Sequence, residues 1–375
     1  TKFDTEGFET KLAATVNYDP ENYLDKKDIR RVDEFIQFGL IASDECVKDS
    51  RLDLGKEDLN RIGVSIGSGI GGLGTIENNK ITLQRKGPKK ISPFFVPGAI
   101  SNMVSGYASL RYGFKGPNIS IASACSSASH SIGYSFRSIS YGDADIMLTG
   151  GAEMATTPLG MSGFNAAKAL STKNENPQSA SRPWDKSRDG FVLGEGAGCL
   201  MLEEYQHAKQ RGANIYAEIV GFGMSADAFH ITAPPENGEG AALAMSNALL
   251  DANLDVSIID YINAHGTSTP QGDVCETQAI KSVFGEHARR LAVSSTKGAT
   301  GHMLGAAGGV EMAVCCKALE TDTVPPTINY LTSDPDCDLD YVPNEARQME
   351  VNAIANNSFG FGGHNACLVA KKFRG

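Results

Sequence analysis

The stretch Asn118-Ile-Ser-Ile-Ala-Ser-Ala-Cys-Ser-Ser-Ala128 determines the fold class of this chain. An apolar, β-prone run over 118–122 leads into Cys125, and apolar residues spaced by three or four then continue to Ile139, which predicts a helix. Gly142 ends this helix, and a second strand-like run follows over 145–149. Strand, helix and strand in this order are typical of an α/β fold.

Cys125 lies where the predicted strand turns into the N-terminus of the predicted helix. The helix dipole and the free N–H groups at such a position favour a thiolate, so Cys125 is a candidate nucleophile. The alternative is a small buried hydrophobic residue in a tight turn, because free cysteines are more often inert filler. Two histidine motifs further along the chain favour the nucleophile.

Composition and charge exclude several classes of protein. The 375 residues are enough for two domains or one large core in two lobes, and 41% of them are hydrophobic. No run of about 18 apolar residues predicts a membrane span. The formal net charge of −10 argues against general nucleic-acid binding. The eight cysteines are scattered without C-x-x-C spacing, which argues against a disulfide framework or a zinc site and favours a reducing compartment.

Alternating strand-like and helix-like segments predict mainly parallel sheets covered by helices. The pattern around Cys125 recurs as a strand over 291–295, a turn through His302 and a helix over 305–319. We therefore expect a duplicated unit, divided near Gly212 into residues 1–212 and 213–375. Further predicted strands cover 61–66, 199–203, 217–221 and 260–264, and further predicted helices cover 204–211 and 240–252.

Two short motifs near the first predicted strand point to other functions. Gly67-Ser-Gly-Ile-Gly-Gly72 has the G-x-G-x-x-G pattern of dinucleotide-binding loops, but that fingerprint also needs a helix immediately after it and an acidic residue about 20 positions on. Residues 86–92 contain no acid. Gly63-Val-Ser-Ile-Gly67 matches G-x-S-x-G, but its serine lies within the strand, so the nucleophile elbow of a hydrolase is not expected.

Two of the seven histidines lie in Gly/Ser/Thr-rich turns at predicted strand ends, where α/β folds place their sites. His265 is in Asn263-Ala-His-Gly-Thr-Ser-Thr269, and His302 ends Ser294-Ser-Thr-Lys-Gly-Ala-Thr-Gly-His302, which also contains Lys297. A cysteine with two such histidines favours activation of a thiolate or stabilisation of a developing negative charge. Metal binding is the weaker interpretation, because no carboxylate or third histidine has ligand spacing.

These residues give the chain its resemblance to the β-ketoacyl-acyl-carrier-protein synthases, specifically the type II elongating condensing enzymes. The resemblance covers essentially the whole chain. It is carried by the motifs around Cys125, His265 and His302, and also by Ser181-Arg-Pro-Trp-Asp-Lys186, Phe191-Val-Leu-Gly-Glu-Gly-Ala-Gly198 and Asn357-Ser-Phe-Gly-Phe-Gly-Gly363.

The resemblance implies a thiolase-like, duplicated α/β fold with five layers, α-β-α-β-α, and a homodimer. It also implies an acyltransferase of fatty acid biosynthesis that uses no metal and no bound cofactor, since phosphopantetheine arrives on the acyl carrier protein. Cys125 would accept an acyl group, malonyl-carrier would lose CO₂, and the resulting carbanion would attack the acyl-cysteine to give a 3-ketoacyl product two carbons longer. His265 and His302 would stabilise the enolate.

Further roles follow from the resemblance. The N–H groups of Cys125 and Phe359 would form the oxyanion hole, and Lys297 would pair with Glu311, either for catalysis or as a purely structural ion pair. Residues expected to contact the acyl chain or the phosphopantetheine arm are Ile70, Phe164, Phe359, Thr267 and Thr269. The basic residues expected to dock the acidic carrier protein, otherwise an ordinary solvated surface, are Lys27, Arg30, Arg31, Lys89, Lys90 and Lys168.

Two other functions share the fold. A thiolase would carry a second catalytic cysteine near the C-terminus, where this chain has Phe359, and a non-condensing chain-length factor would lack Cys125. The chain also lacks the strand and helix with which family members open, and loss of a central strand would expose apolar neighbours. His364 stands where many relatives have threonine and is not expected to be catalytic. The expected location is the bacterial cytoplasm, or alternatively an organelle stroma or matrix.

Overall fold

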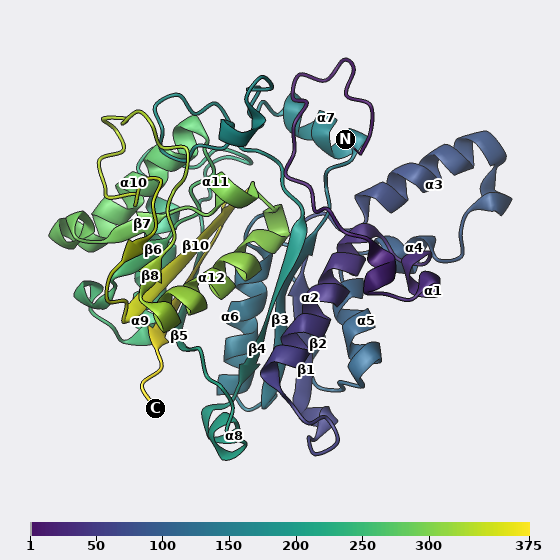
Figure 1. The fold of residues 1–375 in the computed structure, drawn as a ribbon, viewed down its shortest axis with the longest axis horizontal. Coiled ribbons are helices and arrows are strands. Elements are labelled where there is room, and N and C mark those ends of the chain that lie inside the picture. The colour runs from purple at the N-terminus through teal and green to yellow at the C-terminus, as the bar shows by residue number, and fades with distance from the viewer. Residues whose placement is uncertain (1) are drawn as a thin grey trace.

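The computed structural model describes residues 2–375 as two packed sheets with helices between and around them (Figure 1). The first sheet has the strand order β2-β1-β3-β4 and the second has the order β5-β11-β10-β6-β7. The strands are β1 (Ile62–Gly67), β2 (Asn118–Ile119), β3 (Ile146–Glu153), β4 (Gly196–Glu203), β5 (Ala217–Ala226), β6 (Tyr261–Asn263), β7 (Ala292–Ser294), β10 (Ala353–Gly360) and β11 (His364–Lys372), and β8 (Thr323–Val324) pairs with β9 (Arg347–Gln348) outside both sheets.

Both sheets are mixed, so the prediction of mainly parallel sheets was too simple. β1 pairs in parallel with β2 and β3, but β4 is antiparallel to β3. In the second sheet β6 pairs in parallel with β7 and β10, whereas β11 is antiparallel to both of its neighbours. The reason is the short connection 361–363 between β10 and β11, because a turn of this length can join only antiparallel strands.

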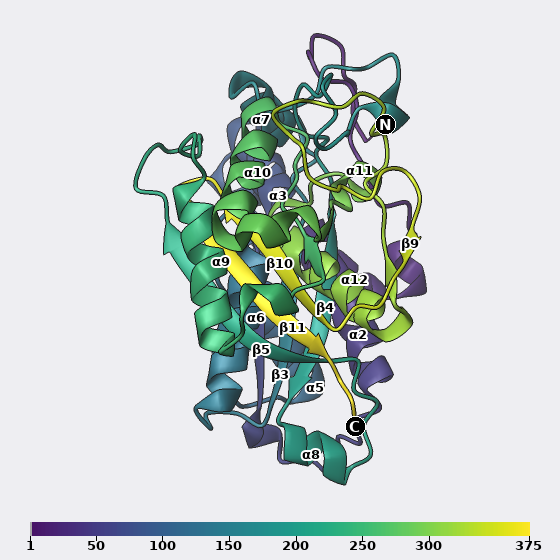
Figure 2. The same cartoon turned by 90° about the vertical axis from the view of Figure 1, so that its left-hand side faces the viewer.

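The helices form three layers around the two sheets, which confirms the five-layered α-β-α-β-α fold (Figures 1 and 2). Two helices lie between the sheets, two cover the outer face of the first sheet, and two cover the outer face of the second. The helices between the sheets are α6 (Ser127–Ser140) and α12 (Ala307–Thr321). The first sheet is covered by α2 (Glu34–Ser50) and α5 (Met103–Tyr112), and the second by α9 (Glu239–Ala252) and α10 (Pro270–Phe284).

The remaining helices lie at the ends of the sheets. α3 projects from the body on the side of the first sheet, and α8 lies at the opposite end from α7 (Figure 1). They are α1 (Lys26–Ile29), α3 (Leu73–Lys86), α4 (Phe95–Ala99), α7 (Pro158–Ala166), α8 (Tyr205–Gln210) and α11 (Lys297–Thr300). Among the residues described, none of the helices combines the length and the apolar character needed to cross a membrane.

Small residues allow the two central helices to pack closely between the sheets. A Cβ atom at Gly308 of α12 would lie 2.1 Å from Ser129 Oγ of α6, so a side chain there would force Ser129 to move. The Ser129 hydroxyl in turn forms a 2.7 Å hydrogen bond with the Ser358 hydroxyl on β10. The heads of α6 and α12 are therefore held at a fixed distance from each other and from the second sheet.

The predicted duplication is visible in how the two central helices begin. The chain leaves β2, passes Cys125 and enters α6, and it leaves β7, passes His302 and enters α12. β2 and β7 each form one edge of their sheet. The division of the chain near Gly212 falls between β4 and β5, and the boundary itself stays a prediction.

The two sheets differ at their other edges. β5 pairs with β11 at the edge of the second sheet, but among residues 2–375 no strand pairs with the outer edge of β4. A groove of about 1080 Å³ runs along this edge, and Cys199, Leu200, Met201 and Leu202 of β4 contribute to its walls. The expected difference at a central strand is not found: within residues 2–375 the first sheet has four strands and the second has five, and the two differ at this edge.

Candidate active site

Cys125 lies in a tight turn between β2 and α6, two residues before the helix begins. The residue before it, Ala124, has a φ of 51°, a left-handed conformation that is uncommon for a residue with a side chain. The Ser126 hydroxyl donates to the backbone carbonyls of Ser358 and His364 at 2.9 and 2.7 Å. The strained turn is thus tied to the β10–β11 hairpin, which places Cys125 at the contact between the two halves.

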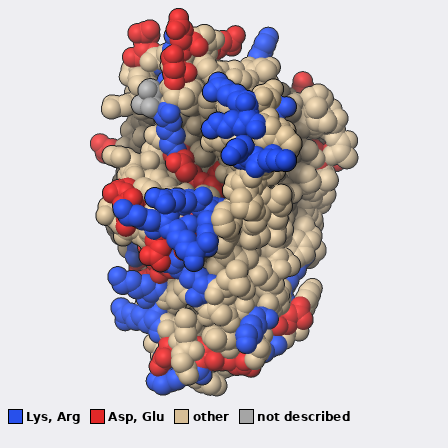
Figure 3. Space-filling view, turned by 90° about the vertical axis from the view of Figure 1, so that its right-hand side faces the viewer, with Lys and Arg blue, Asp and Glu red and all other residues tan. Residues whose placement is uncertain are grey.

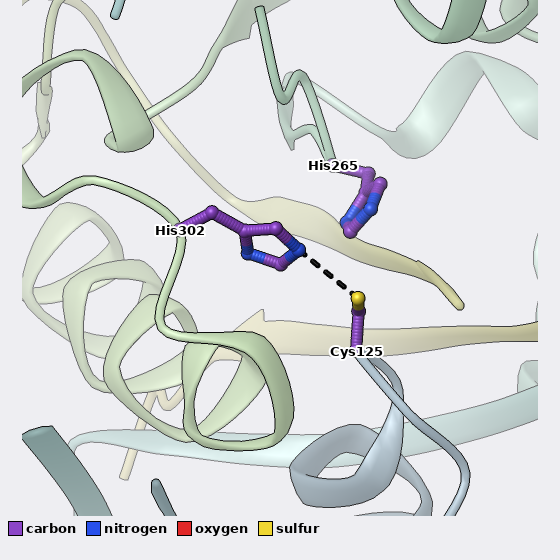
Figure 4. Close-up of side chains that lie close together, drawn as sticks. All are labelled: Cys125, His265 and His302. Carbon is purple, nitrogen blue, oxygen red and sulfur yellow. Dashed lines mark hydrogen bonds between the residues drawn. The ribbon is translucent and has the colours of Figure 1, made fainter. Parts of the chain in front are cut away.

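The two predicted histidines face Cys125 from the other half of the chain (Figure 4). His302 Nε2 lies 3.0 Å from Cys125 Sγ. The His265 ring packs edge-on against the His302 ring with the centroids 5.2 Å apart. One ligand atom from each of the three side chains lies within 4.8 Å of the other two. The structure therefore brings together the three residues that the sequence singled out.

The resting Cys125 is a thiol, not the thiolate expected from its place at a helix N-terminus. Burial raises the pKa of the Cys125 thiol to about 12, and this effect outweighs the nearby positive charge of Lys297, which lowers it. Cys125 is only 7% exposed, so water cannot stabilise a thiolate. The nucleophile must lose its proton to a neighbouring base during the reaction, and His302 is in contact with the sulfur.

Both histidines are neutral at physiological pH. Burial lowers the pKa of His265 and of His302 well below the usual 6.5, and the positive charge of Lys297 lowers both further. A neutral imidazole has one N–H to donate and one nitrogen that can accept a proton. The pair can therefore act as a base toward a thiol and as hydrogen-bond donors toward a developing oxyanion.

Lys297 pairs with Glu311, as predicted. Lys297 begins α11, Glu311 lies on α12, and both side chains are almost completely buried. Burial of the Glu311 carboxyl raises its pKa, and the Lys297 ammonium lowers it. Separation of the two partners would leave a buried charge without its counterpart, which is costly. The pair therefore holds α11 and α12 together, and His302 lies between these two helices in the chain.

The backbone N–H next to the Cys125 sulfur is that of Phe361, whereas the sequence led us to expect the N–H of Phe359. The backbone N–H groups that hydrogen-bond to the Cys125 sulfur are those of Cys125 and Phe361, and both lower the pKa of the thiol. Phe359 instead packs its ring against His265, with the centroids 5.6 Å apart. The difference arises because Phe359 lies within β10, whereas Phe361 is in the turn that follows. The second phenylalanine of Asn357-Ser-Phe-Gly-Phe361 was the signal available in the sequence.

A buried carboxylate that no sequence pattern indicated holds the His265 turn. Glu276 on α10 accepts the N–H groups of His265 and Gly266 at 2.9 and 2.7 Å, and the Asn357 side-chain amide at 3.2 Å. Burial raises the pKa of Glu276 to about 7, against the effect of these donors. Its partners are ten or more residues away, so no local motif marked it.

The residues expected at the acyl chain and at the phosphopantetheine arm come from several segments, and their roles stay predictions. Phe164 on α7 packs edge-on against Phe191, and both belong to an apolar cluster that contains Cys125. Ile70, in the loop after β1, is 40% exposed. The hydroxyls of Thr267 and Thr269, in the His265 turn, lie 3.0 Å apart.

Lys and Arg side chains gather on the face that Figure 3 shows, which is the side of the molecule where α1 and α3 lie in Figure 1. The basic residues expected to dock a carrier protein belong to segments on or near this side. They come from α1, from the loop after α3 and from the end of α7. Within the described part of the chain none of the six forms an ion pair, and Arg31 instead stacks over the Phe94 ring at 4.6 Å. This carrier-docking patch comprises Lys27, Arg30, Arg31, Lys89, Lys90 and Lys168.

Cys125, His265 and His302 are also the only group among the described residues in which three potential metal ligands converge. A sulfur and two imidazole nitrogens are ligands that zinc accepts. A zinc ion held there would occupy both the nucleophile and the histidines. The group can therefore bind a metal ion or transfer an acyl group, but it cannot do both at once.

A strained cysteine at the head of a central helix, faced by two neutral histidines in a five-layered duplicated fold, defines a cysteine-dependent acyl-transferring enzyme. Family models bear this out: residues 7–208 match "Beta-ketoacyl synthase, N-terminal domain" and residues 216–331 match "Beta-ketoacyl synthase, C-terminal domain". This chain belongs to the beta-ketoacyl synthase family.

Individual relatives agree with the family models. The chain is 55% identical over 373 residues to 3-oxoacyl-[acyl-carrier-protein] synthase 2 of Vibrio cholerae and 54% identical over 373 residues to that of Coxiella burnetii. Each match covers 99% of this chain and 90% of the relative. Among solved structures, a beta-ketoacyl synthase from Burkholderia phymatum superposes with a TM-score of 0.91 at 36% identity, covering 98% of this chain and 90% of that one. A type II polyketide ketosynthase in complex with its acyl-carrier protein superposes with a TM-score of 0.93 at 35% identity, covering 99% and 90%.

Proposed function

We propose that this chain catalyses the decarboxylative condensation of malonyl-acyl-carrier-protein with an acyl chain held on Cys125, which elongates fatty acids by two carbons. The observation that carries the proposal is the 3.0 Å contact between His302 Nε2 and Cys125 Sγ, with His265 beside it. Relatives at 50–55% identity are named 3-oxoacyl-[acyl-carrier-protein] synthase 2.

The first step is acyl transfer to the enzyme. His302 takes the thiol proton as the sulfur attacks the carbonyl carbon of an acyl-carrier thioester. The N–H groups of Cys125 and Phe361 hold the oxyanion of the tetrahedral intermediate. The intermediate collapses, the bond from carbon to the pantetheine sulfur breaks, and the carrier thiol leaves with the proton from His302. An acyl-Cys125 thioester remains.

The second step is decarboxylation of the malonyl group. The bond between the α-carbon and the carboxylate breaks, CO₂ leaves, and the electron pair passes to the thioester oxygen as an enolate. Burial keeps both rings neutral, so each has one N–H that it can donate to that oxygen. For His302 this requires the tautomer with the proton on Nε2, whereas the first step uses the tautomer in which Nε2 accepts the thiol proton. A protonated histidine pair would instead repel each other in this dry site.

The third step forms the carbon–carbon bond. The α-carbon of the enolate attacks the carbonyl carbon of acyl-Cys125, and the N–H groups of Cys125 and Phe361 again hold the oxyanion. The Cys125 sulfur leaves as the intermediate collapses to the 3-oxoacyl-carrier product. The Cys125 thiolate takes up one proton from the solvent, and the free enzyme is restored. No step calls for a metal or a bound cofactor, and we expect EDTA to leave the rate unchanged.

The proposed partner is acyl carrier protein, an acidic protein whose phosphopantetheine arm would enter past Thr267 and Thr269. Support comes from the carrier-docking patch, whose cations lie on one face of a chain with a net charge of −10. A structural neighbour at 35% identity is a ketosynthase solved with its acyl-carrier protein. Complementary charge of this kind mainly accelerates encounter and weakens with salt.

We also propose a homodimer formed through the outer edge of β2. Both residues of this short edge strand are exposed, and Ile119 is 41% exposed. On the neighbouring α5, Leu110 is 78% exposed. Pairing of β2 with its copy about a two-fold axis would cover this edge and extend the first sheet through both subunits. Eight free cysteines accord with a reducing compartment, and the bacterial cytoplasm is the proposed location.

Intact-protein mass spectrometry tests the proposed function. The wild-type chain and Cys125→Ala are mixed with a long-chain acyl-carrier thioester, and malonyl-carrier is added afterwards. We expect a single acyl adduct on the wild type, none on the variant, and discharge of the adduct with release of CO₂. An adduct that only coenzyme A thioesters can form would favour a thiolase. A folded wild type that binds the carrier without any adduct would favour a non-condensing partner.

A further inference from the structure

The glycine-rich loop after β1 binds a carboxylate of the same chain, that of Glu153. The loop has the G-x-G-x-x-G pattern, and α3 follows it directly. Loops of this kind offer backbone N–H groups to phosphate. Here the N–H groups of Gly69 and Ile70 donate to the carboxylate of Glu153, at 2.7 and 3.1 Å.

Glu153 also reaches the turn that carries His302. It is the last residue of β3, its side chain is completely buried, and its carboxylate accepts the Gly305 N–H at 3.1 Å. The Ser68 hydroxyl donates to it as well, at 3.0 Å, and accepts the Gly71 N–H in turn. One carboxylate thus receives four hydrogen bonds from two loops that belong to different halves of the chain.

The close approach of the two loops explains why they carry glycine at these positions. A Cβ atom at Gly305 would lie 2.3 Å from the Gly69 nitrogen and 2.8 Å from Glu153 Oε2. The loops therefore touch each other across the carboxylate. Neither loop could hold its position if the four donors were left without an acceptor, because buried N–H groups without partners are costly.

We propose that Glu153 is a positioning residue that clamps the Ile70 loop, at the acyl pocket, to the His302 turn, at the decarboxylation site. This inference deepens the proposed function and rests on it. Glu153 acts through the two loops: it places the Ile70 side chain against the acyl chain and His302 Nε2 against Cys125. Glu276 holds the His265 turn in the same manner, so each catalytic histidine has its own buried carboxylate.

The clamp links two properties that would otherwise be independent. Under the proposed function Ile70 contacts the acyl chain, and His302 stabilises the enolate that forms when malonyl-carrier loses CO₂. A displacement of about 1 Å in catalytic geometry can cost about a hundredfold in rate. A change at Glu153 should therefore alter acyl-chain selectivity and decarboxylation together, although the side chain touches neither substrate.

The test compares Glu153→Gln with the wild type and with a control, Asp260→Asn. Asp260 also accepts two backbone N–H groups, from Asn352 and Ala353, but it precedes β6 at the end of the strand away from His265. The glutamine keeps the size of the side chain and replaces one acceptor oxygen by an NH₂ group that faces N–H donors. Three quantities are measured: the decarboxylation rate of malonyl-carrier, the ratio of kcat/KM for long and short acyl-carriers, and the midpoint of unfolding in urea.

For Glu153→Gln we expect decarboxylation to fall at least about tenfold and the long-to-short ratio to change at least about threefold, with Cys125 still alkylated by iodoacetamide. Asp260→Asn should lower the urea midpoint without either effect. If Glu153→Gln loses only stability, as the control does, the inference is overturned. The proposed function would still stand in that case, provided that the wild type forms the acyl-enzyme. Failure of the wild type to form acyl-Cys125 would overturn both.

A second variant covers the case in which Glu153→Gln does not fold. Ser68→Ala removes one of the four hydrogen bonds to Glu153 and leaves the carboxylate in place. We expect the same two quantities to change in the same direction by about two- to fivefold, as loss of one buried hydrogen bond predicts. Wild-type values for both quantities in a folded Ser68→Ala would also overturn the inference.

Discussion

His302 Nε2 lies 3.0 Å from Cys125 Sγ, although 177 residues separate the two in the sequence. Cys125 precedes α6 and His302 precedes α12, so the contact exists only because these helices pack side by side between the sheets. The reactive geometry is therefore a property of the interface between the two halves. Changes that shift α6 against α12 should affect catalysis even when they lie far from both residues.

Replacement of the two histidines should have unequal effects. His302→Ala removes the base that contacts the Cys125 sulfur as well as one enolate donor, so both acyl transfer and decarboxylation should fall. His265→Ala removes only an enolate donor, and decarboxylation should fall about a hundred- to a thousandfold while acyl transfer changes far less. The two half-reactions are measured separately, as acyl-Cys125 formation by mass and as CO₂ release.

His287→Ala serves as the control for this comparison. The His287 ring bonds to the Ile259 carbonyl at 2.8 Å, away from the site. We expect it to leave both half-reactions within about twofold of the wild type. Equal losses in both half-reactions for His265→Ala would contradict the role assigned to that residue.

Acid should destabilise the protein in part through His130. Burial lowers the pKa of His130 to about 4, whereas an unfolded histidine titrates near 6.5. Between these values the unfolded chain binds the proton and the folded chain does not, so stability falls as the pH drops below about 6.5. His130 alone should contribute a loss of about 2 kcal/mol at pH 5 relative to pH 7.5.

The measurement is urea unfolding at pH 7.5 and pH 5 for the wild type and for His130→Gln. The pKa of Glu276 is raised to about 7, so protonation of Glu276 increases the stability of the folded state on acidification, whereas protonation of His130 decreases it. The effect of His130 is therefore read from the difference between the variant and the wild type. We expect His130→Gln to lose less stability on acidification than the wild type. His230→Gln, at an exposed position, should behave like the wild type; identical pH dependence for His130→Gln would refute the assignment.

A double replacement can separate the two roles left open for Lys297. Lys297→Met alone leaves the Glu311 carboxylate buried without its partner and should cost about 3–5 kcal/mol, whereas Lys297→Met with Glu311→Leu should restore most of that loss. In the wild type the Lys297 charge lowers the pKa of both His265 and His302. Without that charge the two histidines should be protonated at higher pH. If this matters for catalysis, the acid limb of the pH–rate profile for decarboxylation moves to higher pH in the double variant. An unchanged profile would make the pair purely structural.

Local patterns in the sequence were enough to find the elements and residues that meet at the site. The predicted helix after Cys125 is α6, and the predicted helix after His302 is α12, each displaced by a residue or two. Apolar spacing, glycine and the turn motifs are all encoded within about ten residues. The convergence of Cys125, His265 and His302 followed from the rule that α/β sheets place their sites at strand ends.

The features that the sequence did not reveal depend on contacts between distant segments. Glu153 and Gly305 are 152 residues apart, and nothing near Glu153 indicates a partner. The choice between Phe359 and Phe361 depends on where β10 ends and its turn begins, a difference of two residues that patterns cannot resolve. The protonation state of Cys125 was missed because burial, a tertiary property, outweighs the helix terminus.

Charge reversal in the carrier-docking patch should weaken substrate binding without affecting the chemistry. Lys89→Glu with Lys90→Glu should raise KM for acyl-carrier about tenfold or more and flatten its dependence on salt, with kcat and the alkylation of Cys125 unchanged. Lys209→Glu, on α8 at the far end of the molecule, is the matched surface control. KM is measured between about 50 and 300 mM salt. A KM equal to that of the control would place the carrier elsewhere.

Ala124→Gly should stabilise the fold and slow the enzyme. Ala124 has a φ of 51°, which costs an alanine about 1 kcal/mol relative to glycine, so relief of this strain should raise the free energy of unfolding by up to about 1 kcal/mol. The same change loosens the turn that aims Cys125 at His302, and acyl transfer should fall several-fold. Ala242→Gly, within α9, should have the opposite effect on stability and none on acyl transfer, because glycine in a helix interior is destabilising. Urea unfolding and acyl-enzyme formation measure the two quantities. A less stable Ala124→Gly would show that the left-handed turn is not strained. A more stable variant with full activity would show that the strained turn is not needed to place the nucleophile.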